Sequence, residues 1–209
     1  MNIAVFGITG QTGNYFLTQA LAKGHTLRAL VRTPEKLVET EGVVKITGSA
    51  QDLERVRETI RGSDVVVSLL GHVKGSPDNL LVESFQNILQ AMEKEKVSRL
   101  VILTGAAVEN PKDNPKLVDK IFKFAMGTFA KTILTDAQNA ASLVQQSSVK
   151  WTIVRAPRLT NGAATGEVKI GYLGDSGIST QITRADLAAK VLEISEGEEW
   201  MGELPAVSN

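Results

Sequence analysis

A glycine-rich turn near the start of the chain constrains the fold more than any other feature. Gly7, Gly10 and Gly13 follow an apolar run at residues 3–6 and open an amphipathic stretch at residues 11–23. At this spacing one glycine allows a tight turn, one lets the backbone approach a diphosphate, and one lets the helix pack on the strand. The helix N-terminus then offers free N–H groups to phosphate oxygens. The turn predicts dinucleotide binding, with an ordinary tight strand–helix turn as the alternative.

Polar side chains of the same turn can add hydrogen bonds to the phosphate groups. These are Thr9, Gln11 and Thr12, whose hydroxyl and amide groups are hydrogen-bond donors. We therefore expect the diphosphate to lie on residues 7–13.

Short apolar runs recur between helical patterns along the rest of the chain. The runs are residues 3–6, 27–31, 43–46, 65–70, 100–103 and 151–154. Because they are apolar on both sides, they read as strands of a parallel sheet that helices cover on two faces. This pattern predicts a doubly wound, three-layer α/β/α Rossmann fold with strand order 3-2-1-4-5-6.

The helical patterns differ in clarity. The clearest has an apolar stripe at Leu81, Phe85, Ile88, Leu89 and Met92, and Ser76-Pro77-Asp78 is predicted to mark its start. Residues 117–146 look like one long helix interrupted near Gly127. A short strand is expected at 168–172, and Thr183 with Asp186 forms a capping pattern for a helix over 187–194.

Length and composition indicate one globular domain over residues 1–209, with residues 160–209 forming a small C-terminal region on the substrate side. Lys+Arg and Asp+Glu both number 23, so no basic excess points to nucleic acid or an anionic membrane. The chain has no cysteine and two histidines, which argues against a metal site and favours a reducing compartment. No signal segment and no run of roughly 20 apolar residues is seen, so we expect a cytoplasmic protein, a monomer or homodimer.

The end of the second predicted strand bears on the choice of dinucleotide. NAD-selective proteins carry an acid there for the ribose hydroxyls, whereas this chain has Arg32. A guanidinium suits a 2′-phosphate, and Lys36 lies close enough in sequence to join it. NADP is therefore predicted over NAD; the alternative is a solvated arginine at a strand end.

Several segments together resemble the atypical short-chain dehydrogenase/reductases. The segments are Gly7–Gly13, Leu30-Val31-Arg32, Leu69-Leu70-Gly71, Thr104, Trp151–Pro157 and Thr183–Leu187. Within that group the chain is most similar to the NmrA-like proteins and to the NADPH-dependent flavin reductase (biliverdin-IXβ reductase) group. The likeness runs over almost the whole length.

The resemblance implies positions for further cofactor contacts. Leu70 and Gly71 would pass under the adenosine and ribose side, Thr104 would lie near the nicotinamide ribose, and Pro157 with Arg158 would close over the nicotinamide. All five follow predicted strands, at the sheet edge where open α/β sheets bind ligands.

The chain departs from the flavin reductase pattern at the acceptor end. Gly105 stands where that pattern has a serine, Arg158 replaces a histidine, and residues 48–50 lack the usual acid. Cofactor binding survives these changes, but the identity of the substrate does not carry over.

The tyrosine–lysine pair by which main-line members of the superfamily reduce carbonyls is not found by spacing. Tyr15 and Tyr172 are followed four residues later by Gln19 and Ser176. A flavin or quinone takes a hydride readily and needs no strong protein acid. The sequence is thus compatible with an NADPH-dependent oxidoreductase acting on such a planar acceptor. It is also compatible with a non-catalytic, NmrA-like redox sensor that binds NADP(H) and a protein partner; an epimerase or assembly factor fits less well.

Other candidate residues carry weaker signals. Thr104 and Arg158 are the groups expected nearest the chemistry, Arg158 either as a clamp for an anionic acceptor or as a surface ion-pair partner. His72 is expected to be a solvated loop residue, and Asp136 to be a proton donor only if buried. The stripe Phe122, Ala125, Met126 and Phe129 is expected in the core or an interface.

Overall fold

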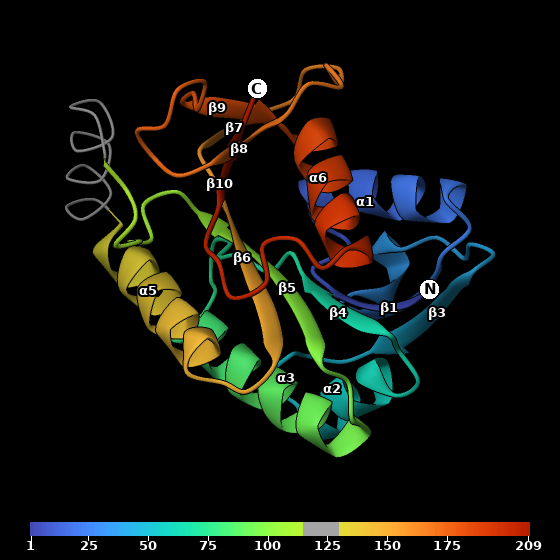
Figure 1. Cartoon of the computed structure of the whole chain (residues 1–209). Coiled ribbons are helices and arrows are strands. Elements are labelled where there is room, and N and C mark those ends of the chain that lie inside the picture. Colours follow the sequence, from blue (N-terminus) through green and yellow to red (C-terminus); the bar gives the residue numbers. More distant parts are fainter. Residues whose placement is uncertain (115–129) are drawn as a thin grey trace.

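The N-terminal apolar run forms a strand at the middle of a large sheet in the computed structural model, which describes residues 1–114 and 130–209 (Figure 1). The strands of this sheet are β1 (Asn2–Phe6), β2 (Thr26–Val31), β3 (Val43–Thr47), β4 (Val65–Ser68), β5 (Arg99–Gly105), β6 (Lys150–Ala156), β8 (Lys169–Gly171) and β10 (Ala206–Ser208). Their order is β3-β2-β1-β4-β5-β6-β10-β8. The first six are parallel, in the predicted order, so the Rossmann prediction is confirmed.

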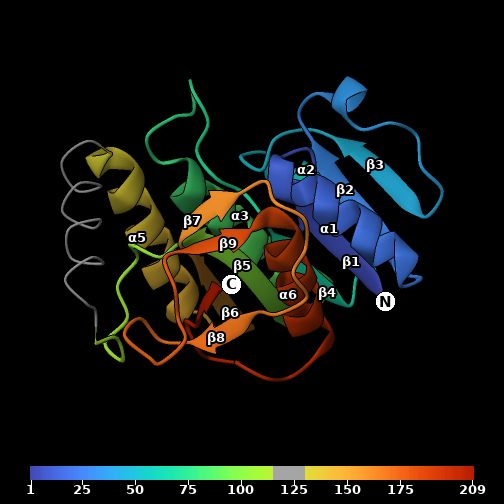
Figure 2. The same ribbon diagram turned by 90° about the horizontal axis from the view of Figure 1, so that it is seen from above.

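Helices cover both faces of the sheet, and this makes three layers (Figures 1 and 2). The helices are α1 (Gln11–Ala22), α2 (Leu53–Ile60), α3 (Leu80–Glu95), α5 (Lys131–Gln145) and α6 (Arg184–Glu196), with a 3₁₀ turn η1 at Pro34–Lys36. One core joins the sheet to α2, α3 and α5, and a second joins it to α1 and α6. The strands are apolar toward both cores, as a doubly covered sheet requires.

The C-terminal segments extend the sheet and add a second, smaller one. β10 runs parallel to β6, and β8 pairs with β10 in the antiparallel sense. β7 (Arg158–Thr160) and β9 (Gln181–Thr183) form a separate two-stranded sheet. β7 begins just after the carboxyl end of β6. Thr183 caps α6 by accepting a hydrogen bond from the amide of Asp186, so the helix begins at Arg184, earlier than predicted.

Two expected boundaries shift. β4 ends at Ser68 rather than Leu70, although the amide of Leu69 still donates to the carbonyl of Phe6 at 2.8 Å. α3 begins at Leu80 without a cap from its own segment: Asp136 of α5 accepts hydrogen bonds from the amides of Leu81 and Val82 instead. The predicted cap at residues 76–78 is therefore wrong.

Part of the expected long helix is observed as α5. The proposed interruption at Gly127 and the stripe Phe122, Ala125, Met126 and Phe129 lie outside the described residues. Within the described ranges, no helix is long and apolar enough to cross a membrane.

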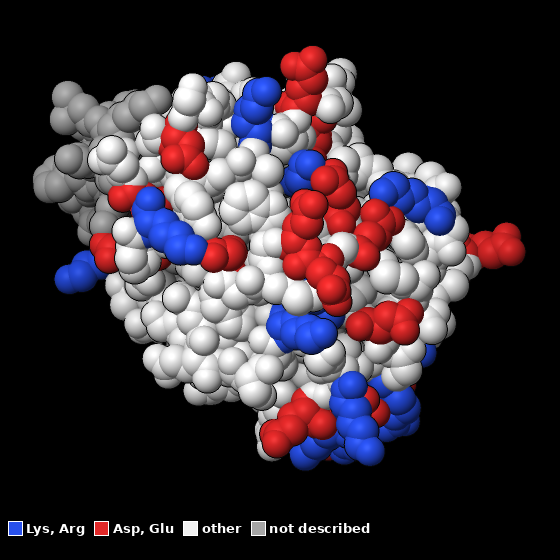
Figure 3. Space-filling view, viewed as in Figure 1, with Lys and Arg blue, Asp and Glu red and all other residues white. Residues whose placement is uncertain are grey.

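Charged side chains of both signs alternate on the face shown in Figure 3, and acidic ones gather around the C-terminal end of α6. Several are paired: Glu196 of α6 binds Lys23 and His25, both at 2.7 Å, and Glu193 binds Lys190 at 2.7 Å. The balance agrees with equal numbers of acidic and basic residues in the sequence.

Candidate functional site

The glycine-rich turn connects β1 to α1 at the carboxyl edge of the sheet. Gly7 has φ +85°, a conformation that favours glycine, and a Cβ there would lie 2.7 Å from the carbonyl carbon and oxygen of Leu69. The turn is thus pressed against the chain leaving β4. This contact brings Gly7 beside Leu69 and Leu70, and Gly71 follows in the chain.

The other two glycines shape the start of α1. A Cβ on Gly13 would lie 2.2 Å from the carbonyl oxygen of Ile8, so only glycine lets α1 pack at this distance. Gly10 donates from its amide to the carbonyl of Gly7 at 3.1 Å, and a Cβ there would lie 3.2 Å from the same oxygen. The structure thus explains all three glycines: a side chain would clash at Gly7 and at Gly13, and Gly10 closes the tight turn.

The N-terminus of α1 is left open. Gly10, its N-cap, has no side chain to hydrogen-bond the first amides, and the first turn holds no acid. The free amides and the helix dipole therefore favour an anion at this end. Near it lie exposed Gln11, half-buried Thr9 and Thr12, which is 8% exposed. These residues fit a dinucleotide diphosphate.

The next strands place the residues expected near the nicotinamide side by side. Thr104 and Gly105 of β5 pair in register with Arg155 and Ala156 of β6, and Pro157 follows directly. A Cβ on Gly105 would meet nothing within 4 Å, so the space beside this strand end is open. Arg158 is exposed at the start of β7, where its amide donates to the carbonyl of Thr180 at 3.2 Å.

Arg32 and Lys36 lie beyond the carboxyl end of β2, the neighbour of β1. Arg32 follows the strand and Lys36 ends η1; both are exposed. Throughout residues 1–114 and 130–209, neither side chain has a hydrogen bond or an ion pair. Two uncommitted cations at this strand end fit the 2′-phosphate expectation, which stays a prediction.

His72, expected to be solvated, is in fact a buried partner of Asp136. Its Nε2 lies 2.7 Å from Oδ2 of Asp136, and the two side chains are 6% and 3% exposed. Asp136 is buried, but it serves as an acceptor for His72 and for two amides of α3 rather than as a free acid. Sequence reasoning missed the pair because its members are 64 residues apart.

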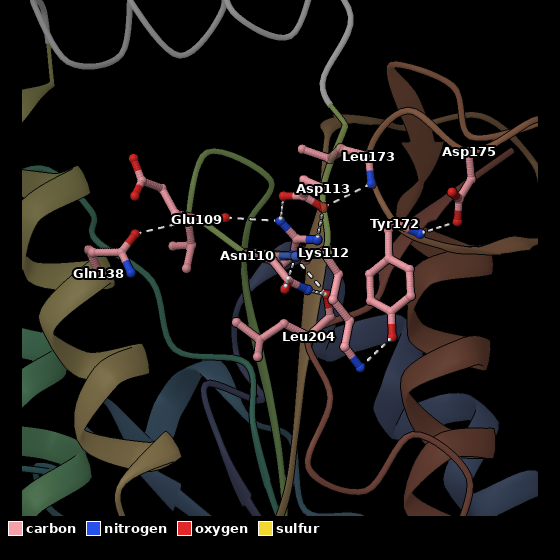
Figure 4. Close-up of polar contacts among 11 residues, drawn as sticks. Glu109, Asn110, Lys112, Asp113, Gln138, Tyr172, Leu173, Asp175 and Leu204 are labelled. Atoms are coloured by element: carbon pink, nitrogen blue, oxygen red, sulfur yellow. Dashed lines mark hydrogen bonds and ion pairs between the residues drawn. The ribbon is translucent and has the colours of Figure 1, made fainter.

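The structure does contain a tyrosine–lysine contact, formed by residues distant in sequence (Figure 4). Lys112 Nζ lies 3.4 Å from the hydroxyl of Tyr172, which donates to Glu203 at 2.8 Å. Burial and the hydrogen bond to Glu203 raise the pKa of Tyr172, although Lys112 acts in the opposite direction. A carbonyl-reducing tyrosine needs a lowered pKa, so this contact does not replace the missing pair.

Arg155, which belongs to the segment that carries the family resemblance, lies at the centre of a buried hydrogen-bond network. Its guanidinium is fully buried and binds Asp113 through two nitrogens at 2.6 and 2.7 Å. It also donates to the carbonyls of Val108 and Leu204, while Asp113 accepts from the amide of Leu173 (Figure 4). The network ties the segment after β5 to β6 and to the C-terminal segments, next to Thr104.

Fold and site together define a class: a doubly wound protein with a glycine turn at an open helix end, the arrangement expected of a dinucleotide site. The chain belongs to a family of NAD(P)H-binding proteins, whose model matches residues 7–197. It is also 27% identical over 220 residues to the uncharacterized protein YwnB of Bacillus subtilis (strain 168), covering 97% of this chain and 96% of that protein.

Solved structures share the fold at low identity. The oxidoreductase ylbE of Lactococcus lactis has a TM-score of 0.82 at 20% identity, over 100% of this chain and 91% of that chain. ChuY of Escherichia coli O157:H7, an anaerobilin reductase, has 0.80 at 22%, over 100% and 97%. A short-chain dehydrogenase/reductase of Veillonella parvula DSM 2008, in complex with NADP, has 0.80 at 16%, over 100% and 94%. At these identities the likeness concerns the fold.

Proposed function

We propose that this chain is an NADPH-dependent oxidoreductase that reduces a flavin, a quinone or a similar planar acceptor. The observation that carries the proposal is the contrast between the two ends of the site. The diphosphate end is built to a steric limit at Gly7 and Gly13, whereas the acceptor end has open space at Gly105 and no acid at the strand ends β5 and β6.

NADPH supplies a hydride when bound, and the protein's part is to bind, orient and exclude water. Thr104 donates a hydrogen bond that orients the nicotinamide ribose but is a poor acid near pH 7. The guanidinium of Arg158 can only donate hydrogen bonds, and it contacts an anionic group of the acceptor. An acceptor that takes its proton from solvent suits this set, and an unactivated ketone does not.

The proposed preference for NADPH over NADH rests on the two cationic residues that follow β2. Arg32 and Lys36 meet the 2′-phosphate with charge-assisted hydrogen bonds, which NADH cannot form. The names of similar folds, among them an oxidoreductase and an anaerobilin reductase, support redox chemistry in general. They leave the acceptor to experiment.

Steady-state rates with a panel of acceptors test the proposal. Riboflavin, FMN and a soluble quinone should be reduced by NADPH, whereas simple aldehydes and ketones should not. Arg158→Ala should raise the KM for FMN, which carries a phosphate, more than it lowers kcat, because it removes uniform binding. Riboflavin, without the phosphate, is the matched control and should change little. Brisk reduction of an unactivated ketone would overturn the proposal.

A further inference from the structure

One carboxylate contacts both the segment that connects β4 to α3 and the first turn of α3 that follows it. This segment, residues 69–79, contains Leu70 and Gly71, which are predicted to lie under the adenosine and ribose side of the cofactor. Asp136 contacts this segment from α5, and it lies 64 residues after His72 in the chain. Nothing in residues 69–79 itself forms a helix or a strand.

At the start of the segment, Asp136 binds His72, the residue after Gly71. The 2.7 Å contact between His72 Nε2 and Asp136 Oδ2 is almost fully withdrawn from solvent. At the far end, the same Oδ2 accepts from the amide of Leu81 at 2.8 Å, and Oδ1 accepts from the amide of Val82 at 3.1 Å.

Those amides belong to the first turn of α3, where a helix leaves backbone N–H groups without intrahelical partners. An ionised carboxylate only accepts hydrogen bonds, so Nε2 of His72 must be the donor. The ring is thereby held in one orientation. Buried charge-assisted hydrogen bonds of this kind are the strong ones in proteins.

We propose that the His72–Asp136 pair is a positioning device for the cofactor site: it holds Leu70 and Gly71 in the conformation that binds the adenosine half of the dinucleotide. His72 acts through the segment and does not contact the reacting atoms. The inference rests on the proposed NADPH site but not on turnover. Its consequence is that dinucleotide affinity depends on a residue outside the cradle.

Two polar substitutions of His72 test whether the hydrogen bond to Asp136 is needed or only a polar side chain at this position. In His72→Gln, the side-chain amide nitrogen occupies about the place of Nε2 and can still donate to Asp136. In His72→Asn, the side chain is too short to do so. The two variants carry the same amide group and differ by one methylene group, which decides whether the side chain reaches Asp136.

The other histidine supplies a matched control. His25 also binds a carboxylate, Glu196, at 2.7 Å with its side chain 11% exposed. It precedes β2 and so lies at the amino edge of the sheet, opposite the cofactor edge. His25→Asn removes a histidine–carboxylate contact without touching residues 69–79.

Isothermal titration at 25 °C with NADPH and with adenosine 2′,5′-bisphosphate tests the inference, on variants whose circular dichroism matches wild type. His72→Asn should raise both Kd values about tenfold, as loss of a charged hydrogen bond implies, and His72→Gln should stay within about threefold. His25→Asn should lower the melting temperature without changing either Kd.

A lowered melting temperature with unchanged Kd in His72→Asn would show that the pair only stabilises the fold and would overturn the inference. If His72→Asn does not fold, Asp136→Asn takes its place. A single carbonyl oxygen cannot serve all three donors, so its Kd should rise several-fold, and an unchanged Kd overturns the inference equally. A wild type that fails to bind NADPH would instead overturn the proposed function.

Discussion

Gly13 lies where any side chain would clash with the backbone of the glycine-rich turn. Its place in the turn is dictated by the carbonyl oxygen of Ile8, which would lie 2.2 Å from a Cβ. The sequence predicted this glycine from spacing alone, because a tight strand–helix turn leaves few solutions. It could not predict that Leu69, which directly follows β4, sets the same kind of limit at Gly7.

Gly13→Ala should therefore damage both stability and cofactor binding. The added methyl forces α1 away from the turn, and overpacking of this kind costs about 1–3 kcal/mol or more. Gly105→Ala is the matched control, since its Cβ would meet nothing within 4 Å. Urea unfolding and NADPH titration of both variants give the comparison. Equal stabilities of the two variants would contradict the steric account.

Arg32 is the residue that should decide between the two dinucleotides. A charged hydrogen bond contributes about 1.5–3 kcal/mol, so Arg32→Ala should weaken NADPH binding by about ten- to a hundredfold and leave NADH nearly unchanged. Lys36→Ala should show the same selectivity with a smaller loss. Equal losses for NADPH and NADH would mean that Arg32 supports the fold instead. Arg61→Ala, on the exposed end of α2, controls for a lost surface charge.

At the scale of elements, the sequence predicted the long regular pieces and one short strand, β8, and missed the other short strands. All six predicted strands exist. Five of them bury apolar side chains on both faces, whereas the edge strand β3 buries Ile46 alone. β7, β9 and β10 have three residues each, too few for a pattern. β10 exists because the C-terminal segment meets β6, a long-range contact that no local signal announces.

The start of α6 carries a pH-dependent contact. Asp186 is 2% exposed; burial acts to raise its pKa, but hydrogen bonds from Thr165, Thr183 and Gly166 outweigh it and hold the pKa below its usual value of 3.8. Because the folded-state pKa is lowered, the stabilisation is present above the unfolded-state pKa and is lost as pH falls through the folded-state pKa.

Asp186→Asn should therefore lower the free energy of unfolding by about 1–3 kcal/mol at pH 7. The difference from wild type should shrink as the pH is taken below 3.8. Urea unfolding of both proteins from pH 7 to pH 3 measures it. Glu193→Gln, which removes an exposed pair on the same helix, should cost less than about 1 kcal/mol. A difference that grows toward low pH would contradict the assignment.

At the scale of the whole molecule, the cofactor half of the site was predictable and its supports were not. The turn, Arg32 and the strand ends follow from local spacing and the rule that parallel strands end at one edge. The His72–Asp136 pair and the Tyr172–Lys112 contact join segments 64 and 60 residues apart. Such pairs depend on how α5 and the C-terminal segments return to the sheet, and so they become visible only in the fold.

Hydride transfer within a preformed complex distinguishes an NADPH-dependent oxidoreductase from a sensor of NADP(H). Protein saturated with NADPH is mixed with FMN or a soluble quinone, and the absorbance at 340 nm is followed through one turnover by stopped flow. For an oxidoreductase of this kind, we expect full loss of the NADPH absorbance at a rate that saturates with acceptor, and no loss with a simple ketone. Tight NADPH binding with no oxidation by any acceptor would show that the chain is a sensor of NADP(H) rather than an enzyme.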